Sequence, residues 1–218
     1  MKKLLFALCC MSLFGFGQQT YVPDDNFESY LESNGMGNGI PNDDYVLSSN
    51  IYMVTNLDIS NQNISDLTGI EGFYSLEYLY CYSNQLTSID ITQNIFLEEL
   101  ACNDNNLSSI DVTQNLFLNY FDCKNNNLSS MDITQNDSLR ALYCSNNQLT
   151  SLDVSNNIFL GGVQDIELSY TSSIERSSRE APAPLSLRTS RAFLNSVCMA
   201  STLSIKSEKS WGSPSSPP

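Results

Sequence analysis

Four cysteines recur at a constant interval along the chain, and thiolates are ligands that zinc prefers; they are Cys81, Cys102, Cys123 and Cys144. If each lies on its own coil of a stacked array, neighbouring thiols are about 5 Å apart and the outer pair about 15 Å apart. Sulfur atoms on one zinc ion lie within about 4.6 Å of each other, so the column cannot form a four-cysteine zinc site. Because parallel in-register strands also give poor disulfide geometry, we interpret these thiols as reduced core residues.

Two acidic patterns could bind calcium. Four aspartates form a second column with the same spacing: Asp90, Asp111, Asp132 and Asp153. Either their carboxylates accept backbone N–H groups of the following turn, or cations lie between them. The first alternative is favoured because turn-forming Thr, Gln and Asn follow in three copies. The Gly- and Asp-containing stretch 34–44 is interpreted as a connecting loop, because Met36 and Tyr45 stand where an EF-hand requires ligands. We predict no metal site and no cofactor.

The composition excludes several chemistries. The 218 residues contain no histidine, which removes Ser-His-Asp and Cys-His catalysis. The net charge of −14 disfavours nucleic acid as a partner, since phosphates repel such a chain. Glu99 and Asp122 could form a glycosidase carboxylate pair, but stacked coils present a flat face without a deep cleft. We therefore predict that the protein is not an enzyme.

These side chains must be positioned by a repeat. Each copy contains an L-x-C-type pair of apolar residues two positions apart, which is strand periodicity, and an asparagine three positions later that turns the chain. Five copies are legible, with their first apolar residues at Leu57, Leu79, Leu100, Phe121 and Leu142. A copy buries its apolar row only against a neighbour, so the copies should stack as a solenoid of parallel strands. Each copy has only about 21 residues, so the opposite side has room only for extended chain or short 3₁₀ turns.

The pattern L-x-x-L-x-C-x-x-N-x-L at 76–86, 97–107, 118–128 and 139–149 resembles the leucine-rich-repeat signature. The sequences at 20–31 and 147–157 are similar to those of exported leucine-rich-repeat proteins of Bacteroidetes, which are internalin-like in style. The resemblance covers about 20–162. It implies a mainly β leucine-rich-repeat solenoid with its strands on a concave face. Two features depart from it: the repeat fails at Val163 and Asp165, and no carboxy-terminal sorting domain is recognisable.

The chain divides into four predicted segments. Residues 1–17 combine two lysines with an apolar run, which indicates a signal peptide. Residues 18–56 form an N-terminal cap whose short helix, begun by an Asp cap, covers the open edge of the first repeat. Residues 57–162 hold the repeats, and the Ser- and Pro-rich tail at 163–218 is disordered or out of frame. Because of the signal peptide we predict a secreted or cell-surface protein, and no internal membrane span is expected.

The outward side of the repeat strands carries the candidate ligand-binding residues. These are Tyr78, Tyr80, Tyr82, Glu99, Tyr120, Asp122, Lys124 and Tyr143. Tyrosine offers a rigid contact with a polar tip to a protein, and its ring stacks on sugars. Tyrosine also simply suits exposed strands. Two hypotheses follow: a binding module that holds a protein or glycan on this face, and a structural spacer or adhesin segment without a ligand on the repeats.

Overall fold

The computed structural model describes residues 17–160 and the two-residue strand at 166–167. The predicted signal peptide, apart from its last residue, and most of the predicted tail lie outside the described residues. No helix in the described part of the chain is long and apolar enough to cross a membrane.

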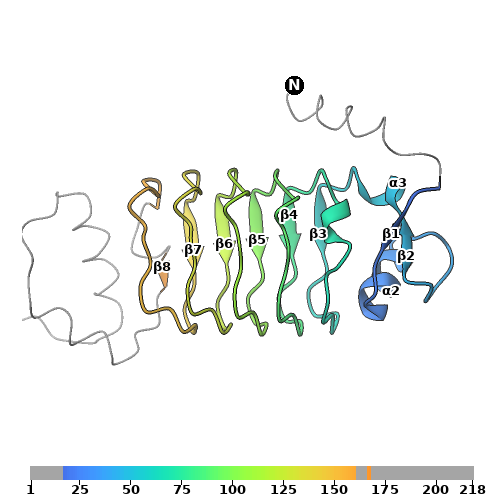
Figure 1. The fold of residues 1–218 in the computed structure, drawn as a ribbon, viewed down its shortest axis with the longest axis horizontal. Coiled ribbons are helices and arrows are strands. Elements are labelled where there is room, and N and C mark those ends of the chain that lie inside the picture. Colours follow the sequence, from blue (N-terminus) through green and yellow to red (C-terminus); the bar gives the residue numbers. More distant parts are fainter. Residues whose placement is uncertain (1–16, 161–165, 168–218) are drawn as a thin grey trace, which may run out of the picture.

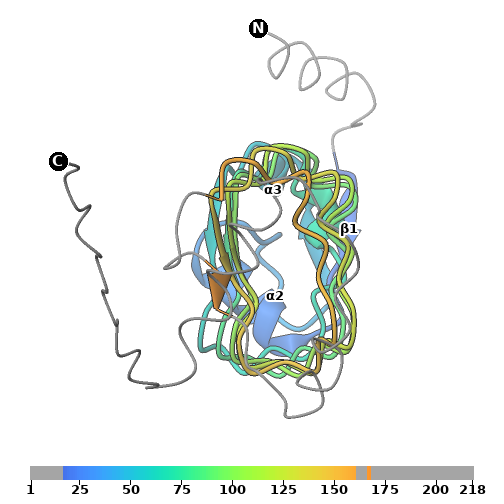
Figure 2. The ribbon, with the colours of Figure 1, turned by 90° about the vertical axis from the view of Figure 1, so that its left-hand side faces the viewer.

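The repeats form a solenoid of short parallel strands. The strands β3 to β8 lie side by side in chain order (Figure 1). Their bounds are β3 Asn56–Asp58, β4 Tyr78–Tyr80, β5 Glu99–Ala101, β6 Tyr120–Asp122, β7 Ala141–Tyr143 and β8 Ile166–Glu167. From β3 to β7 each strand opens one of the five predicted copies. Seen along the stack, the coils superpose in one outline (Figure 2). The predicted fold class is therefore confirmed.

The register of the sheet matches the sequence repeat up to β7. Equivalent residues pair across each step, such as Leu79 with Leu100 and Leu100 with Phe121. The next strand departs from the period, because Leu142 pairs with Ile166 and not with Val163, where the repeat would place the partner. One strand therefore joins the sheet beyond the boundary predicted at residue 162.

Each coil contributes one layer to a continuous core. In the copy that begins at β4 the layer contains five fully buried side chains: Leu79, Cys81, Leu86, Ile91 and Leu97. Neighbouring coils cover this layer on both sides, so the hydrophobic stabilisation requires the stack. The side opposite the strands contains only turns and the 3₁₀ helix η1 Ile70–Gly72 in the described part of the chain, as the repeat length predicts.

Two columns of buried asparagines join the coils. In the first column, Asn105 donates its amide to the carbonyls of Cys81 and Cys102 and accepts the N–H of Leu86. Asn84, Asn126 and Asn147 make the same type of bonds. In the second column, on the turn side, each amide donates to two carbonyls of the preceding coil; its members are Asn94, Asn115, Asn136 and Asn157. Both columns satisfy backbone groups that would otherwise be buried without partners.

The N-terminal cap closes one end of the stack. It contains β1 Gln19–Tyr21, paired antiparallel with β2 Tyr45–Leu47, and the helices α2 Asp25–Ser33 and α3 Ser48–Ile51. Asp24 caps α2 by accepting two backbone N–H groups, as predicted. Its second oxygen accepts the N–H and hydroxyl of Ser65, and Phe27 stacks on Phe73 at 6.4 Å. The helix is thus fastened onto the first coil.

Candidate binding face

We use the name strand face for the outward side of β3 to β7. Parallel register places equivalent side chains in columns along this face. One column contains Tyr78, Glu99, Tyr120 and Ala141, and the next contains Tyr80, Ala101, Asp122 and Tyr143. The alternation predicted from the L-x-C pairs therefore holds, since Leu79, Leu100, Phe121 and Leu142 point inward and are fully buried.

The strand face carries an open hollow of about 390 Å³. It is lined by Tyr80, Tyr82, Glu99, Ala101, Asn103, Tyr120 and Asp122. Five of the eight predicted residues therefore meet there. Ala101 is the physical cause of the hollow, because this small residue occupies the column position between Tyr80 and Asp122. The predicted set omitted Ala101 and Asn103, although a small residue in an otherwise bulky column is a signal that sequence could supply.

Tyr80 and Glu99 form a hydrogen-bonded pair across two coils. The Tyr80 hydroxyl donates to Glu99 Oε2 at 2.7 Å. Burial, followed by the hydrogen bond to Glu99, raises the pKa of Tyr80 to about 12. The phenol therefore stays protonated at neutral pH and donates to the carboxylate, which keeps further acceptor sites for a partner's donors.

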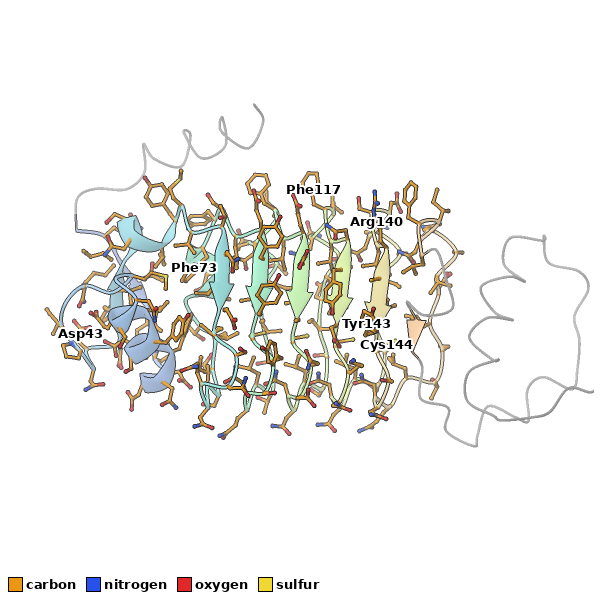
Figure 3. All side chains as sticks on the ribbon, turned by 180° about the vertical axis from the view of Figure 1, so that it is seen from behind. Asp43, Phe73, Phe117, Arg140, Tyr143 and Cys144 are labelled. Carbon is orange, nitrogen blue, oxygen red and sulfur yellow. The ribbon has the colours of Figure 1, made fainter. Side chains whose placement is uncertain are left out.

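The other half of the face has an acid, a base and an aromatic pair. Lys124 Nζ lies 3.6 Å from Asp122 Oδ2 and 5.1 Å from the centre of the Tyr143 ring. Tyr143 packs against Tyr120 with 5.6 Å between ring centres; it is labelled on β7 in Figure 3. Burial raises the pKa of Asp122 although Lys124 acts against this shift. Lys124 and Tyr143 thus adjoin the hollow through these contacts.

Tyr78 is the predicted residue that lies outside the hollow's lining and its direct contacts. It pairs in register with Glu99 but does not line the hollow. The eight residues therefore lie together on one face. Tyr80, Tyr82, Glu99, Tyr120 and Asp122 line the hollow, Lys124 and Tyr143 contact this lining, and Tyr78 lies next to Glu99.

The cysteine column lies in the core of the stack. Cys81, Cys102, Cys123 and Cys144 are buried and form no disulfide among the described residues, and no three of them lie close enough to share one ion there. Burial raises the pKa of Cys81 to about 12 and that of Cys102 and Cys123 well above the usual value. Protonated thiols are poor nucleophiles and poor metal ligands, so the prediction of core cysteines is confirmed.

The aspartate column is held by the chain itself. Asp90 Oδ1 accepts the hydroxyl and backbone N–H of Thr92, and the same bonds recur two copies later between Asp132 and Thr134. The hydrogen bonds from Thr92 lower the pKa of Asp90. The predicted backbone bonds are therefore present, and the column needs no cation to orient it.

A second exposed surface was not predicted. Leu116, Phe117, Ile158 and Phe159 are large apolar residues that are about half exposed or more, at the turns that precede the strands. Phe117 stacks on Phe96 at 6.4 Å, and the Arg140 guanidinium lies 6.0 Å from the centre of the Phe159 ring. Figure 3 shows Phe117 and Arg140 along one border of the coils. This aromatic ridge lies outside the strand face.

Comparison with known proteins identifies proteins that are similar to this chain. No family model matches the chain. Over 74 residues the chain is 38% identical to internalin J of Listeria monocytogenes serotype 4b (strain F2365), which corresponds to 34% of this chain and 8% of that protein. The structure of the functional domain of internalin J from Listeria monocytogenes, which includes a cysteine ladder, matches with a TM-score of 0.62 and 36% identity over 70% of this chain and 34% of that one.

Two more solved structures share the architecture. A leucine-rich-repeat protein of Leptospira interrogans matches with a TM-score of 0.52 and 25% identity, over 58% of this chain and 34% of that one. Internalin F of Listeria monocytogenes matches with a TM-score of 0.56 over 68% of this chain and 43% of that one, and at 21% identity it shows the fold alone. The chain thus spans under half the length of each of these proteins.

Proposed function

We propose that the chain, an internalin-like leucine-rich-repeat solenoid, is exported and holds a protein or glycan partner on the strand face, centred on Tyr80, Glu99, Tyr120 and Asp122. Solenoids of this kind present extended concave surfaces that bind partners. The observation that carries this proposal is the hollow at Ala101, where half-buried tyrosines and oriented carboxylates surround one open space. Aromatic residues with fixed polar groups are the usual anchors of a recognition surface.

The electrostatics of the strand face favour recognition over a purely structural role. Residues 18–162 contain 19 acidic residues against Lys124 and Arg140, a net charge of −17. Asp122 is only 7% exposed, and burial of a carboxylate opposes folding unless the group is fully paired. A spacer gains nothing from such a residue. A binding surface gains a desolvated acceptor whose interaction with a partner is stronger than that of an exposed acid.

The test is binding to glycan arrays and to arrays of extracellular proteins by the full chain and by Tyr80→Ala and Tyr120→Ala. Loss of a central aromatic anchor should weaken binding by about 30-fold, corresponding to about 2 kcal/mol. Tyr45→Ala is the matched control, because Tyr45 is an exposed tyrosine in the cap, on β2. Equal binding by all three variants, or no ligand on either array, would favour the spacer hypothesis. Circular dichroism should show that each variant is folded.

A further inference from the structure

The cap contains a cluster of three carboxylates. Carboxylate oxygens of Asp25, Glu28 and Asp44 all lie within 4.8 Å of one another. Asp25 and Glu28 are three positions apart on α2 and so share one face of the helix. Asp44 comes from the loop 34–44, which returns from α2 to β2; Asp43 marks this loop in Figure 3.

Glu28 is the unusual member of the cluster, because its side chain is completely buried. Its Oε1 accepts the backbone N–H of Asp43 at 3.1 Å, whereas its Oε2 is buried without a hydrogen-bond partner. Asp24, a buried carboxylate in the same cap, differs sharply: its two oxygens accept five hydrogen bonds, from Asn26, Phe27, Ser65 and Asp66. The fold thus supplies hydrogen-bond donors to both oxygens of Asp24 but to only one oxygen of Glu28.

No side chain of the cap can neutralise the cluster. Within residues 17–160 the basic residues are Lys124 and Arg140, in the copies of β6 and β7 at the other end of the stack (Figure 1). A buried carboxylate must be paired with a cation, coordinate a metal ion or take up a proton. Two further carboxylates within 4.8 Å leave a bound cation as the arrangement that satisfies all three groups.

We propose that Asp25, Glu28 and Asp44 form a calcium site in the N-terminal cap. Hard oxygen ligands select calcium, magnesium or manganese over zinc and copper. Calcium takes about six to eight oxygen ligands at about 2.3–2.6 Å in a flexible geometry, which suits three carboxylates whose oxygens lie within 4.8 Å of one another. Magnesium requires oxygens at about 2.0–2.1 Å and a stricter octahedron. The partly exposed positions of Asp25 and Asp44 leave room for water to complete the shell.

The ion would fasten the loop 34–44 to α2. The Asp44 carbonyl already accepts the Val22 N–H at 2.8 Å, and Asn38 donates to Asp43 at 3.0 Å, so the loop is placed before the ion binds. Since α2 covers the first coil through Phe27, calcium would stabilise the closed end of the solenoid. This inference goes beyond the proposed function and uses no residue of the strand face.

The experiment is calcium titration of the full chain, followed by isothermal titration calorimetry and by thermal unfolding. Free calcium at about 100 times its dissociation constant should raise the melting temperature by about 5–10 °C. Magnesium should raise it less, and sodium chloride of equal ionic strength should not reproduce the effect. Glu28→Gln should abolish the calorimetric signal. Asp137→Asn is the matched control, since it removes one negative charge from an exposed position of a distant copy.

The order of the melting temperatures of the wild type and Glu28→Gln, without and with calcium, distinguishes ion binding from a structural role of Glu28. With a chelator present, Glu28→Gln should melt at the same temperature as the wild type or higher, because an unneutralised buried carboxylate is removed. With calcium present, the wild type should melt higher. Tyrosine-sensitised terbium luminescence that calcium displaces would give a second readout. The proposal is overturned if calcium gives no heat of binding, or if Glu28→Gln responds to calcium as the wild type does.

Discussion

Replacing Asn126 by alanine should destabilise the solenoid far more than replacement of a surface polar residue. Asn126 Oδ1 accepts the N–H of Leu107 at 2.9 Å, and Nδ2 donates to the carbonyls of Cys102 and Cys123 at 3.0 and 3.1 Å. The side chain is only 6% exposed, so water cannot replace it without opening the turn. The substitution thus leaves one buried donor and two buried acceptors without this partner.

The magnitude follows from those three groups. An unsatisfied buried polar group costs about 1–3 kcal/mol, and carbonyls, which have two lone pairs, suffer less than an N–H. We expect Asn126→Ala to lower the free energy of unfolding by about 3–5 kcal/mol. Because each coil is covered by its neighbours, the loss acts on the stacking of two coils and not on one turn alone.

The assay is urea denaturation of the full chain, followed by circular dichroism. The neighbouring residue supplies the control: Asn127 is exposed in the same turn, and Asn127→Ala should change the unfolding free energy by less than about 0.5 kcal/mol. Equal effects of the two substitutions would refute the reasoning, since of these two side chains only that of Asn126 bonds to the neighbouring coil, whereas Asn127 does so through its backbone N–H, which the substitution keeps. Asn126→Asp should not rescue the stability, because a carboxylate cannot donate to the two carbonyls.

Three further predictions concern buried and paired groups. Cys102→Ala should lower the free energy of unfolding, measured by urea denaturation, by about 1 kcal/mol or somewhat more, and Cys102→Ser should lower it further because a hydroxyl would be buried there. Equal losses for the two variants would place the thiol outside the core. Hydrogen bonds from Thr113 lower the pKa of Asp111. This pair therefore stabilises the fold above the unfolded-state pKa, about 3.9, and the stabilisation is lost as the pH falls through the folded-state pKa. Between pH 7 and pH 3 the urea midpoint of Asp111→Asn should decrease less than that of the wild type. Burial raises the pKa of Asp122, so its charge opposes folding at pH 7 but not below the unfolded-state pKa. Asp122→Asn should therefore raise the midpoint at pH 7 and not at pH 3, and a lower midpoint at pH 7 would show that the contact with Lys124 outweighs burial.

Sequence was sufficient for the fold because each inward position repeats. Leu79, Cys81 and Asn84 recur one copy later as Leu100, Cys102 and Asn105, and a side chain enclosed by identical neighbours has few alternative environments. The spacing of two between Leu and Cys specified the strand, and the asparagine specified the turn. The helix of the cap was equally legible from Asp24 and the apolar residues that follow it.

The second asparagine column escaped prediction for a physical reason. Asn94 and its equivalents lie at turns among Thr and Gln, where exposed polar residues are normal. Their burial depends on carbonyls of the preceding coil, such as those of Ile70 and Phe73, which the local pattern does not contain. Recurrence of asparagine at the same position in four copies was the available signal.

The acidic cluster of the cap was missed because it is not contiguous. An EF-hand draws its ligands from one loop, and the stretch 34–44 failed that template at Met36 and Tyr45. The structure instead combines one face of α2 with the last residue of the loop. Such a combination depends on how the loop returns to β2, which the backbone bond from Val22 to Asp44 fixes. Spacing alone could not supply that geometry.

In this solenoid, the positions that break the repeat indicate function more clearly than those that keep it. The inward columns keep one residue type because every copy meets the same neighbours, and their role is accounted for by stacking. The strand-face column changes from Tyr80 to Ala101, Asp122 and Tyr143 over four coils, although the backbone environment of these four positions is nearly the same. Stacking does not account for the variation, because Ala101 and Asp122 are equally buried, at 7% exposure, and yet differ in size and charge. The partner surface that we propose accounts for both the hollow at Ala101 and the buried acid beside it.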